Sequence, residues 1–234
     1  MEKQVEFKVG NLTLRGTLYT PKGSGPFPGI VIFHGRGSSR KSYDQLSQRL
    51  AEMGFLVHNF DFRGCGKSDG VLEEGTQRMG IDDARAGLEI LLKQNLDRNR
   101  IGIVGSSFGG FVGAVLAGEY DIKSMALRAP AVYPNETLDT YVDSIEGLKF
   151  PKEKWLESIA YKEIQKFKGK LLLVESEKDE VVASWVVKAY FENAITATKK
   201  ELSIQKGAPH SLSATPKFKK EFEDKVIEWF SETL

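Results

Sequence analysis

The residues best suited to chemistry lie in the run Gly105-Ser106-Ser107-Phe108-Gly109. This run has the form G-x-S-x-G and joins a stretch typical of a strand to a stretch typical of a helix. At such a junction the chain turns sharply. The residues two positions before and two positions after the serine then have hardly any room for a Cβ. The turn exposes the Ser107 hydroxyl and directs the N-terminus of the following helix at the group it attacks. Short glycine and serine runs also occur by chance in loops, so a nucleophile needs partners elsewhere in the chain.

Those partners must be a base and an acid. A serine hydroxyl is a weak nucleophile until a base removes its proton and an acid orients and stabilises that base. The only histidine after Ser107 is His210, in a loop between the last expected strand and the last expected helix. Asp179 lies several residues beyond the end of the preceding strand, with Glu177 and Glu180 as alternatives. A single loop carboxylate is usually just solvated, but this order and these positions predict a triad of Ser107, Asp179 and His210.

A second glycine-bearing loop, His34–Gly37, follows a buried strand. The backbone N–H groups of Arg36 and Phe108 are predicted to point at the oxygen that becomes negative during acyl transfer. We expect the Arg36 side chain to point into solvent, with contact to an anionic substrate as the alternative. His34 precedes the serine and is expected to brace its loop through a hydrogen bond. His58 falls within a strand pattern and is expected to be a core or edge residue.

The elements that position these residues alternate along the chain. Apolar runs without strict alternation favour parallel strands covered on both faces, and the runs between them have helical spacing. The expected strands are Gln4–Val9, Leu12–Tyr19, Gly29–Phe33, Phe55–Phe60, Ile101–Gly105, Ser124–Leu127, Leu171–Glu175 and Glu201–Ile204. The expected helices are Tyr43–Met53, Ile81–Gln94, Phe111–Glu119, Ser184–Ala194 and Lys217–Phe230. The order predicts an α/β fold with a mostly parallel central sheet and helices on both faces.

One connection, between Arg128 and Lys170, is about forty residues long, far longer than the usual link in such folds. It contains two amphipathic patterns: Leu138, Tyr141, Val142, Ile145 and Leu148, then Trp155, Leu156, Ile159, Tyr161, Ile164 and Phe167. We predict a small helical cap at about 131–168, over the sheet edge where ligands bind, with Tyr141 and Trp155 in the substrate pocket. The alternative is an extra helix pair packed on the body. In both cases residues 1–234 are expected to form a single domain.

The composition argues against several other classes of protein. Thirty-three basic and 32 acidic residues give a net charge of +1, which provides no case for binding nucleic acid. No apolar run reaches the roughly 18 residues that span a bilayer, and Met1–Glu6 lacks the apolar core of a signal peptide. Cys65 is the only cysteine, which favours the cytoplasm. With three histidines and no Cys/His cluster, no metal or cofactor is expected. The oligomeric state stays open, a homodimer being one option.

With these motifs in place, the chain resembles the α/β-hydrolase superfamily over essentially its whole length. The resemblance rests on the loop His34–Gly37, the run Asp61–Gly70, the turn at Ser107, and on Asp179 and His210. The run Asp61–Gly70 is similar to the D-x-R-G-x-G-x-S segment common in esterases, lipases and peptidases of this superfamily. The compact size and the short insertion are similar to the branch of cinnamoyl/feruloyl esterases and monoglyceride lipases. The resemblance implies an α/β-hydrolase fold with a short cap.

Within the run Asp61–Gly70, the charged side chains are expected to have structural roles. Asp61, Arg63 and Asp69 are predicted to brace their loop. Cys65 fits a small buried residue better than a reactive thiol.

The predicted function is hydrolysis of a carboxylic ester of a small molecule through an acyl-enzyme. Ser107 attacks the carbonyl, His210 transfers the proton to the leaving alcohol, Asp179 orients His210, and no cofactor takes part. Two alternatives stay open. One is a peptidase or amidase that uses the same triad, and the other is a non-catalytic binding protein on a hydrolase scaffold.

Overall fold

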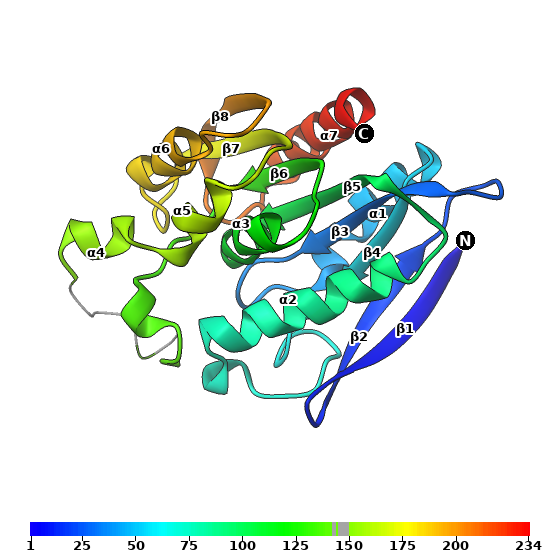
Figure 1. The fold of residues 1–234 in the computed structure, drawn as a ribbon, viewed down its shortest axis with the longest axis horizontal. Helices are drawn as coiled ribbons and strands as arrows, with labels where there is room; N and C mark the ends of the chain where they lie inside the picture. The colour runs from blue at the N-terminus through cyan, green and yellow to red at the C-terminus, as the bar shows by residue number, and fades with distance from the viewer. Residues whose placement is uncertain (142–143, 145–149) are drawn as a thin grey trace.

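The fold is built on one large sheet. The computed structural model describes residues 1–141, 144 and 150–234. Their strands form an eight-stranded sheet in the order β1-β2-β4-β3-β5-β6-β7-β8 (Figure 1). The pairs β1–β2 and β2–β4 are antiparallel, whereas the other neighbouring pairs are parallel. The strands are β1 (Glu2–Val9), β2 (Leu12–Tyr19), β3 (Phe27–Phe33), β4 (Leu56–Phe60), β5 (Leu96–Ser106), β6 (Ser124–Arg128), β7 (Lys170–Lys178) and β8 (Lys199–Pro209).

Helices cover both faces of this sheet (Figure 1). Buried side chains of α1 and α7 join one apolar core, and those of α2, α3, α5 and α6 join a second core on the opposite face. The α-helices are α1 (Asp44–Glu52), α2 (Gln77–Leu92), α3 (Phe108–Glu119), α4 (Lys152–Leu156), α5 (Ile159–Ile164), α6 (Ser184–Asn193) and α7 (Pro216–Thr233). Short 3-10 helices are η1 (Arg40–Tyr43), η2 (Leu72–Glu74) and η3 (Asn135–Thr137).

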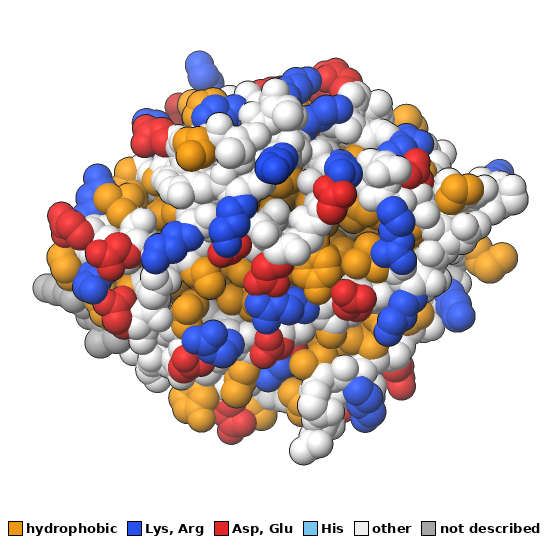
Figure 2. All heavy atoms as spheres, in the orientation of Figure 1, with side chains coloured by type: hydrophobic (Ala, Val, Ile, Leu, Met, Phe, Trp, Pro, Cys, Tyr) orange, Lys and Arg blue, Asp and Glu red, His pale blue; other side chains and the backbone are white. Residues whose placement is uncertain are grey.

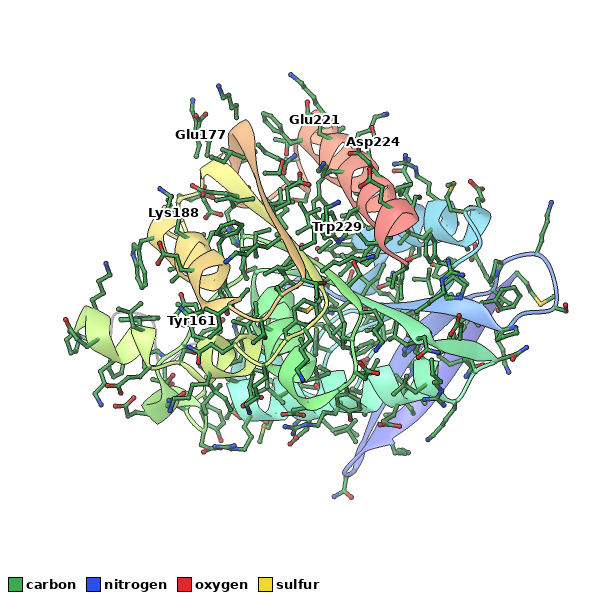
Figure 3. The ribbon with its side chains drawn as sticks, turned by 45° about the horizontal axis from the view of Figure 1, so that its top comes forward. Tyr161, Glu177, Lys188, Glu221, Asp224 and Trp229 are labelled. Atoms are coloured by element: carbon green, nitrogen blue, oxygen red, sulfur yellow. The ribbon has the colours of Figure 1, made fainter. Side chains whose placement is uncertain are left out.

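Helix α7 illustrates how sequence spacing determines packing. Phe222, Val226 and Trp229 recur at helical spacing and are buried against the sheet. Trp229 projects from α7 towards the sheet, whereas Glu221 and Asp224 lie on the outer side of the helix (Figure 3). The amphipathic pattern thus fixes which face of α7 meets the core.

Acidic and basic side chains lie interspersed on the face shown in Figure 2, as expected for a chain with a net charge of +1. None of the helices described is long and apolar enough to cross a membrane.

The structure confirms the predicted fold class, but several elements begin earlier than expected. Helix α2 begins at Gln77 because Thr76 caps it, the Thr76 Oγ1 accepting a bond of 3.2 Å from the Met79 N–H. Strand β5 begins at Leu96, which pairs with Phe27 ahead of a register shift. The residues between Leu96 and the apolar run are polar, so the sequence pattern did not predict this extension of the strand.

The long connection between β6 and β7 contains η3, α4 and α5. Helix α5 packs on the body: Tyr161 is buried, its Oη donates to the Val186 carbonyl at 3.2 Å, and its ring lies 4.8 Å from that of Tyr190 (Figure 3). This half of the connection therefore behaves as the packed helix that was the alternative to a cap. Three residues of the first amphipathic pattern, Val142, Ile145 and Leu148, lie outside the described residues.

Candidate active site

Ser107 occupies the turn between β5 and α3. Its φ of 51° lies in the region that residues other than glycine rarely adopt. The N–H of Ser107 donates to the Arg128 carbonyl at 2.9 Å, and its own carbonyl accepts from the Ala131 N–H at 3.0 Å. A Cβ at Gly105 would clash with the Gly109 carbonyl, and one at Gly109 would clash with the backbone of β3. The two glycines are therefore required by the turn, as the sequence predicts.

The structure brings Ser107, His210 and Asp179 together from the ends of β5, β8 and β7. The His210 Nε2 lies 3.1 Å from the Ser107 Oγ, and its Nδ1 lies 2.9 and 2.8 Å from the two Asp179 carboxylate oxygens. Asp179 Oδ1 also accepts from the N–H groups of Val181 and Val182 at 2.9 and 2.7 Å. Burial favours the neutral acid, but bonds from His210, Val182 and Val181 outweigh it and lower the pKa of Asp179. Asp179 is thus held ionised beside the imidazole.

The two alternative acids contact the histidine loop through its backbone. Glu177 accepts from the Gly207 N–H at 2.8 Å, and Glu180 accepts from the His210 N–H at 3.2 Å. Neither forms a bond to the imidazole. The geometry therefore favours Asp179 as the partner of the ring and gives Glu177 and Glu180 a part in holding the loop.

The two predicted oxyanion donors come from neighbouring elements. Phe108 is the first residue of α3, where a backbone N–H has no partner inside the helix. Arg36 follows Gly35, and a Cβ built on Gly35 would lie 3.4 Å from the Cβ of Ser107. The expectation that the Arg36 side chain points into solvent is wrong: the residue is half-buried, and its Nη2 donates to the Leu72 carbonyl at 3.2 Å.

The other two histidines have structural surroundings. His34 is fully buried, its Nδ1 lies 2.7 Å from the Gly35 carbonyl, and its Nε2 accepts from the Phe62 N–H at 3.1 Å. Burial lowers the pKa of His34, so the ring is neutral while it braces the loop. His58 is also buried, with its Nδ1 2.8 Å from the Gly87 carbonyl.

Two buried ion pairs hold the loop that follows β4. Asp61 accepts from the N–H and from the guanidinium of Arg40, both at 2.7 Å. Arg63 donates to both carboxylate oxygens of Asp83, at 2.9 and 2.6 Å. Asp61 and Arg63 therefore brace this loop, as predicted. Sequence reasoning missed their partners Arg40 and Asp83, because an ion pair between distant segments leaves no local pattern.

The end of the same loop is tied to the first hairpin. Asp69 accepts from the Arg15 guanidinium at 2.7 Å and from the Thr13 N–H at 2.9 Å. These bonds lower the pKa of Asp69 to about 2. Cys65 is 6% exposed and burial raises the pKa of its thiol, in agreement with a structural residue.

A cavity of about 440 Å³ opens beside Ser107 and His210. It lies between the loop after β3, the end of β6 and the first turns of α7. Its polar lining includes Arg36, Ser38, Lys41, Ser42, Tyr43, Ser106, Arg128, Ser211, Ser213, Lys219 and Glu223, beside the apolar Leu212 and Phe222. Sequence reasoning missed this lining. The signal that could have found it is Arg128, because a charged residue at the end of a central strand lies at the sheet edge where ligands bind.

The two predicted pocket residues lie elsewhere. Neither Tyr141 nor Trp155 lines the cavity beside Ser107. Tyr141 is 52% exposed and forms an isolated bridge with Thr76. Trp155 packs half-buried against the core, and its Nε1 donates to the Phe150 carbonyl at 3.4 Å. Amphipathic spacing identified residues that cover apolar surface without identifying which surface.

Nothing in the described ranges, 1–141, 144 and 150–234, groups three or more His, Cys, Asp or Glu side chains as a metal site would require.

The family of the chain follows from comparison with known proteins. A family model described as serine aminopeptidase, S33 (Hydrolase_4) matches residues 26–160. The chain belongs to this α/β-hydrolase family. The match to some S33-family relatives is partial: Esterase EstD of Thermotoga maritima is 27% identical over 131 residues, covering 53% of this chain and 32% of the esterase. The chain thus spans about a third of the length of this and other curated relatives that it matches.

Solved structures of about the same size share the S33-family fold. Est1E from Butyrivibrio proteoclasticus, solved with ferulic acid bound, has a TM-score of 0.73 at 18% identity and covers 97% of this chain and 99% of its own. A monoacylglycerol lipase from Paleococcus ferrophilus has a TM-score of 0.70 at 21% identity, covering 93% and 98%. At these identities the likeness shows the fold alone.

Proposed function

We propose that this hydrolase cleaves carboxylic esters of small molecules through an acyl-enzyme on Ser107. The observation that carries the proposal is the position of His210, within hydrogen-bond distance of the Ser107 Oγ on one side and of the Asp179 carboxylate on the other. This is the geometry that a serine nucleophile needs for activation.

In the proposed reaction Ser107 Oγ attacks the ester carbonyl while its proton moves to His210 Nε2. The N–H groups of Arg36 and Phe108 stabilise the negative oxygen of the tetrahedral intermediate. His210 then donates its proton to the departing alcohol, which leaves the acyl group on Ser107. A water molecule, deprotonated by His210, attacks the acyl-enzyme and releases the acid. Asp179 stabilises the imidazolium in both halves of the reaction.

A peptidase or amidase is the second candidate, because the description of the matching family model is serine aminopeptidase, S33. An aminopeptidase needs an acidic group free to bind the substrate ammonium. In the cavity beside Ser107 the carboxylate is Glu223, which already lies 3.4 Å from Arg49 and 3.9 Å from Lys219. These two cations offset the charge of Glu223, although its Oε1 forms no hydrogen bond among the described residues, and the offset favours the ester over the aminopeptide. A non-catalytic binding protein is the third candidate, and the assembled triad counts against it.

The remaining features of the proposal concern the chain as a whole. We propose that residues 1–234 act as one domain, that a cap lies within about 131–168, and that the protein works in the cytoplasm on a small molecule without nucleic acid. The outer part of the insertion, including α4 and Trp155, is the part proposed as the cap, because α5 is packed into the body.

A fluorophosphonate probe tests the nucleophile. The wild-type protein should be labelled, and Ser107→Ala should lose both labelling and hydrolysis of p-nitrophenyl esters. Ser106→Ala is the matched control, since it removes the neighbouring hydroxyl and should keep the labelling. Labelling that survives Ser107→Ala but disappears in Ser106→Ala would overturn the assignment.

A further inference from the structure

The cavity beside Ser107 has an unusual charge for a pocket in a nearly neutral protein. Four of its lining residues, Arg36, Lys41, Arg128 and Lys219, are cationic, and one, Glu223, is anionic. Glu223 is also bonded by Arg49 from outside the lining. The cavity therefore has an excess of positive charge, whereas the face shown in Figure 2 mixes both signs.

Arg128 is the most deeply placed of these cations. It is 5% exposed and lies at the end of β6, in register with Ser106 on β5. Its Nη2 lies 2.8 Å from the Ser176 Oγ and 2.9 and 2.6 Å from the carbonyls of Pro209 and His210. Its Nε has no hydrogen-bond partner among the residues that the structure describes. The Nη2 of this guanidinium thus holds the histidine loop, and Arg128 also lines the cavity, where a bound anion would supply the further acceptors that a buried cation requires.

No carboxylate is bonded to Arg128 within the described parts of the chain. Burial lowers the pKa of this guanidinium, which means that desolvation disfavours its charge. A buried charge is stable when it is paired, and the space for a partner is the cavity itself. Lys219, whose side chain is 34% exposed, also lines the cavity and lies nearer the solvent.

We infer that this cavity is a subsite for a carboxylate group of the substrate, bound by Arg128 within the cavity and by Lys219 nearer the solvent. The planar guanidinium of Arg128 presents its N–H donors in the geometry that suits the two oxygens of a carboxylate. The serine hydroxyls of the lining, such as Ser38 and Ser42, can donate to the same oxygens. This inference rests on the proposed function, since it names the class of ester: one that carries a carboxylate at a distance from the ester carbonyl.

Matched pairs of substrates test the subsite on either side of the ester bond. Mono-p-nitrophenyl adipate and p-nitrophenyl hexanoate differ by a carboxylate on the acyl chain, and 4-acetoxybenzoate and 4-methylphenyl acetate differ by one on the alcohol. We expect kcat/KM to favour the charged member of at least one pair by about tenfold or more, the size of effect that a hydrogen bond to a charged group supports. In Arg128→Gln and in Lys219→Gln that ratio should fall towards one.

The ratio is the readout because Arg128 also bonds the His210 loop, so Arg128→Gln will slow both members of a pair. Lys219→Gln has no bond to that loop. Lys217→Gln is its matched control, on the same helix with the same loss of charge but outside the cavity lining, and should keep the wild-type ratio. A ratio near one in the wild-type protein for both pairs, or a ratio that Arg128→Gln and Lys219→Gln leave unchanged, would overturn the subsite.

A binding measurement separates this inference from the esterase proposal. Isothermal titration of Ser107→Ala with monomethyl adipate, which carries one carboxylate and one ester, should detect binding that weakens about tenfold or more in the double variant with Arg128→Gln. Binding without hydrolysis of any ester would overturn the proposed function and leave the subsite standing. Hydrolysis of neutral esters, with no binding of the carboxylate and no preference for the charged substrates, would overturn the subsite and leave the proposed function standing.

Discussion

At the scale of single residues, the arrangement of Asp179 explains why it can serve the triad better than its neighbours. Its Oδ1 is held by two backbone N–H groups, so the carboxylate is oriented before it meets His210. These bonds and the one from the imidazole lower its pKa against the opposing effect of burial. Asp179 therefore remains charged when His210 takes up a proton, as stabilisation of the imidazolium requires.

We predict that Asp179→Asn lowers kcat by roughly 10⁴-fold while preserving the fold. The amide keeps the shape of the side chain but removes the charge that stabilises protonated His210. Steady-state kinetics on a p-nitrophenyl ester, with circular dichroism to check folding, measures the effect.

Glu177→Gln is the matched control for that variant. Glu177 lies two residues away and bonds only the Gly207 N–H, so its kcat should stay within about tenfold of wild type. If Glu177→Gln proved more damaging than Asp179→Asn, the acid would have been assigned to the wrong residue.

The residues of the candidate triad could be read from the sequence because each follows a strand and their order along the chain is diagnostic. The cavity lining could not. Arg128, Lys219 and Tyr43 come from three separate elements, and only the packing of α7 and η1 against the end of the sheet brings them together. The side chain of Arg36 was misjudged for the same reason, since its acceptor, Leu72, lies on a different loop.

At the scale of elements, the insertion between β6 and β7 has two parts with different burial. Helix α5 contributes Ala160, Tyr161 and Ile164 to the core beside α3 and α6. Helix α4 has no buried residue. The apolar residues of both helices belong to the second amphipathic pattern in the sequence. Periodicity shows that a segment has an apolar face and does not measure how much of that face is covered.

We predict that Tyr161→Ala lowers the free energy of unfolding by about 3–5 kcal/mol, the usual cost of deleting a large buried aromatic side chain. The ratio of kcat/KM between ester substrates should stay as in the wild type. Urea unfolding and a substrate panel measure the two quantities on the same protein.

Trp155→Ala is expected to change substrate selectivity more than stability. This half-buried residue should cost less stability than Tyr161, about 1–2 kcal/mol. If α4 acts as a cap, the variant should change the ranking of bulky aryl esters against short alkyl esters. A loss of stability with an unchanged ranking would remove the cap from the proposal and leave α4 as packing alone.

At the scale of the whole molecule, the burial of His58 makes the stability of the fold depend on pH. His58 stacks on Phe60 at 5.4 Å, and its Nε2 has no hydrogen-bond partner among the described residues. Burial lowers the pKa of His58 from 6.5 to about 4. The unfolded chain therefore binds a proton between these two pH values that the folded chain does not.

The direction in which stability changes with pH follows from this difference in proton binding. Stability is fully present above the unfolded pKa and declines as the pH falls towards the folded one, by at most about 1.4 kcal/mol per pH unit for one histidine. We predict a lower urea midpoint at about pH 5 than at about pH 7, a window in which most carboxylates stay ionised in both states. His58→Gln, which cannot titrate, should show a smaller drop. An equal drop in both proteins would show that His58 has no part in the acid sensitivity.

The main chain of His210 is tethered by opposite charges. The Glu180 carboxylate accepts from its N–H, and the Arg128 guanidinium donates to its carbonyl. The orientation of the imidazole is thus set by charge as well as by packing. One of the two charges, Arg128, lines the cavity that we assign to substrate. An anion bound at Arg128 would then order the loop that carries the base, so that occupancy and readiness to react rise together.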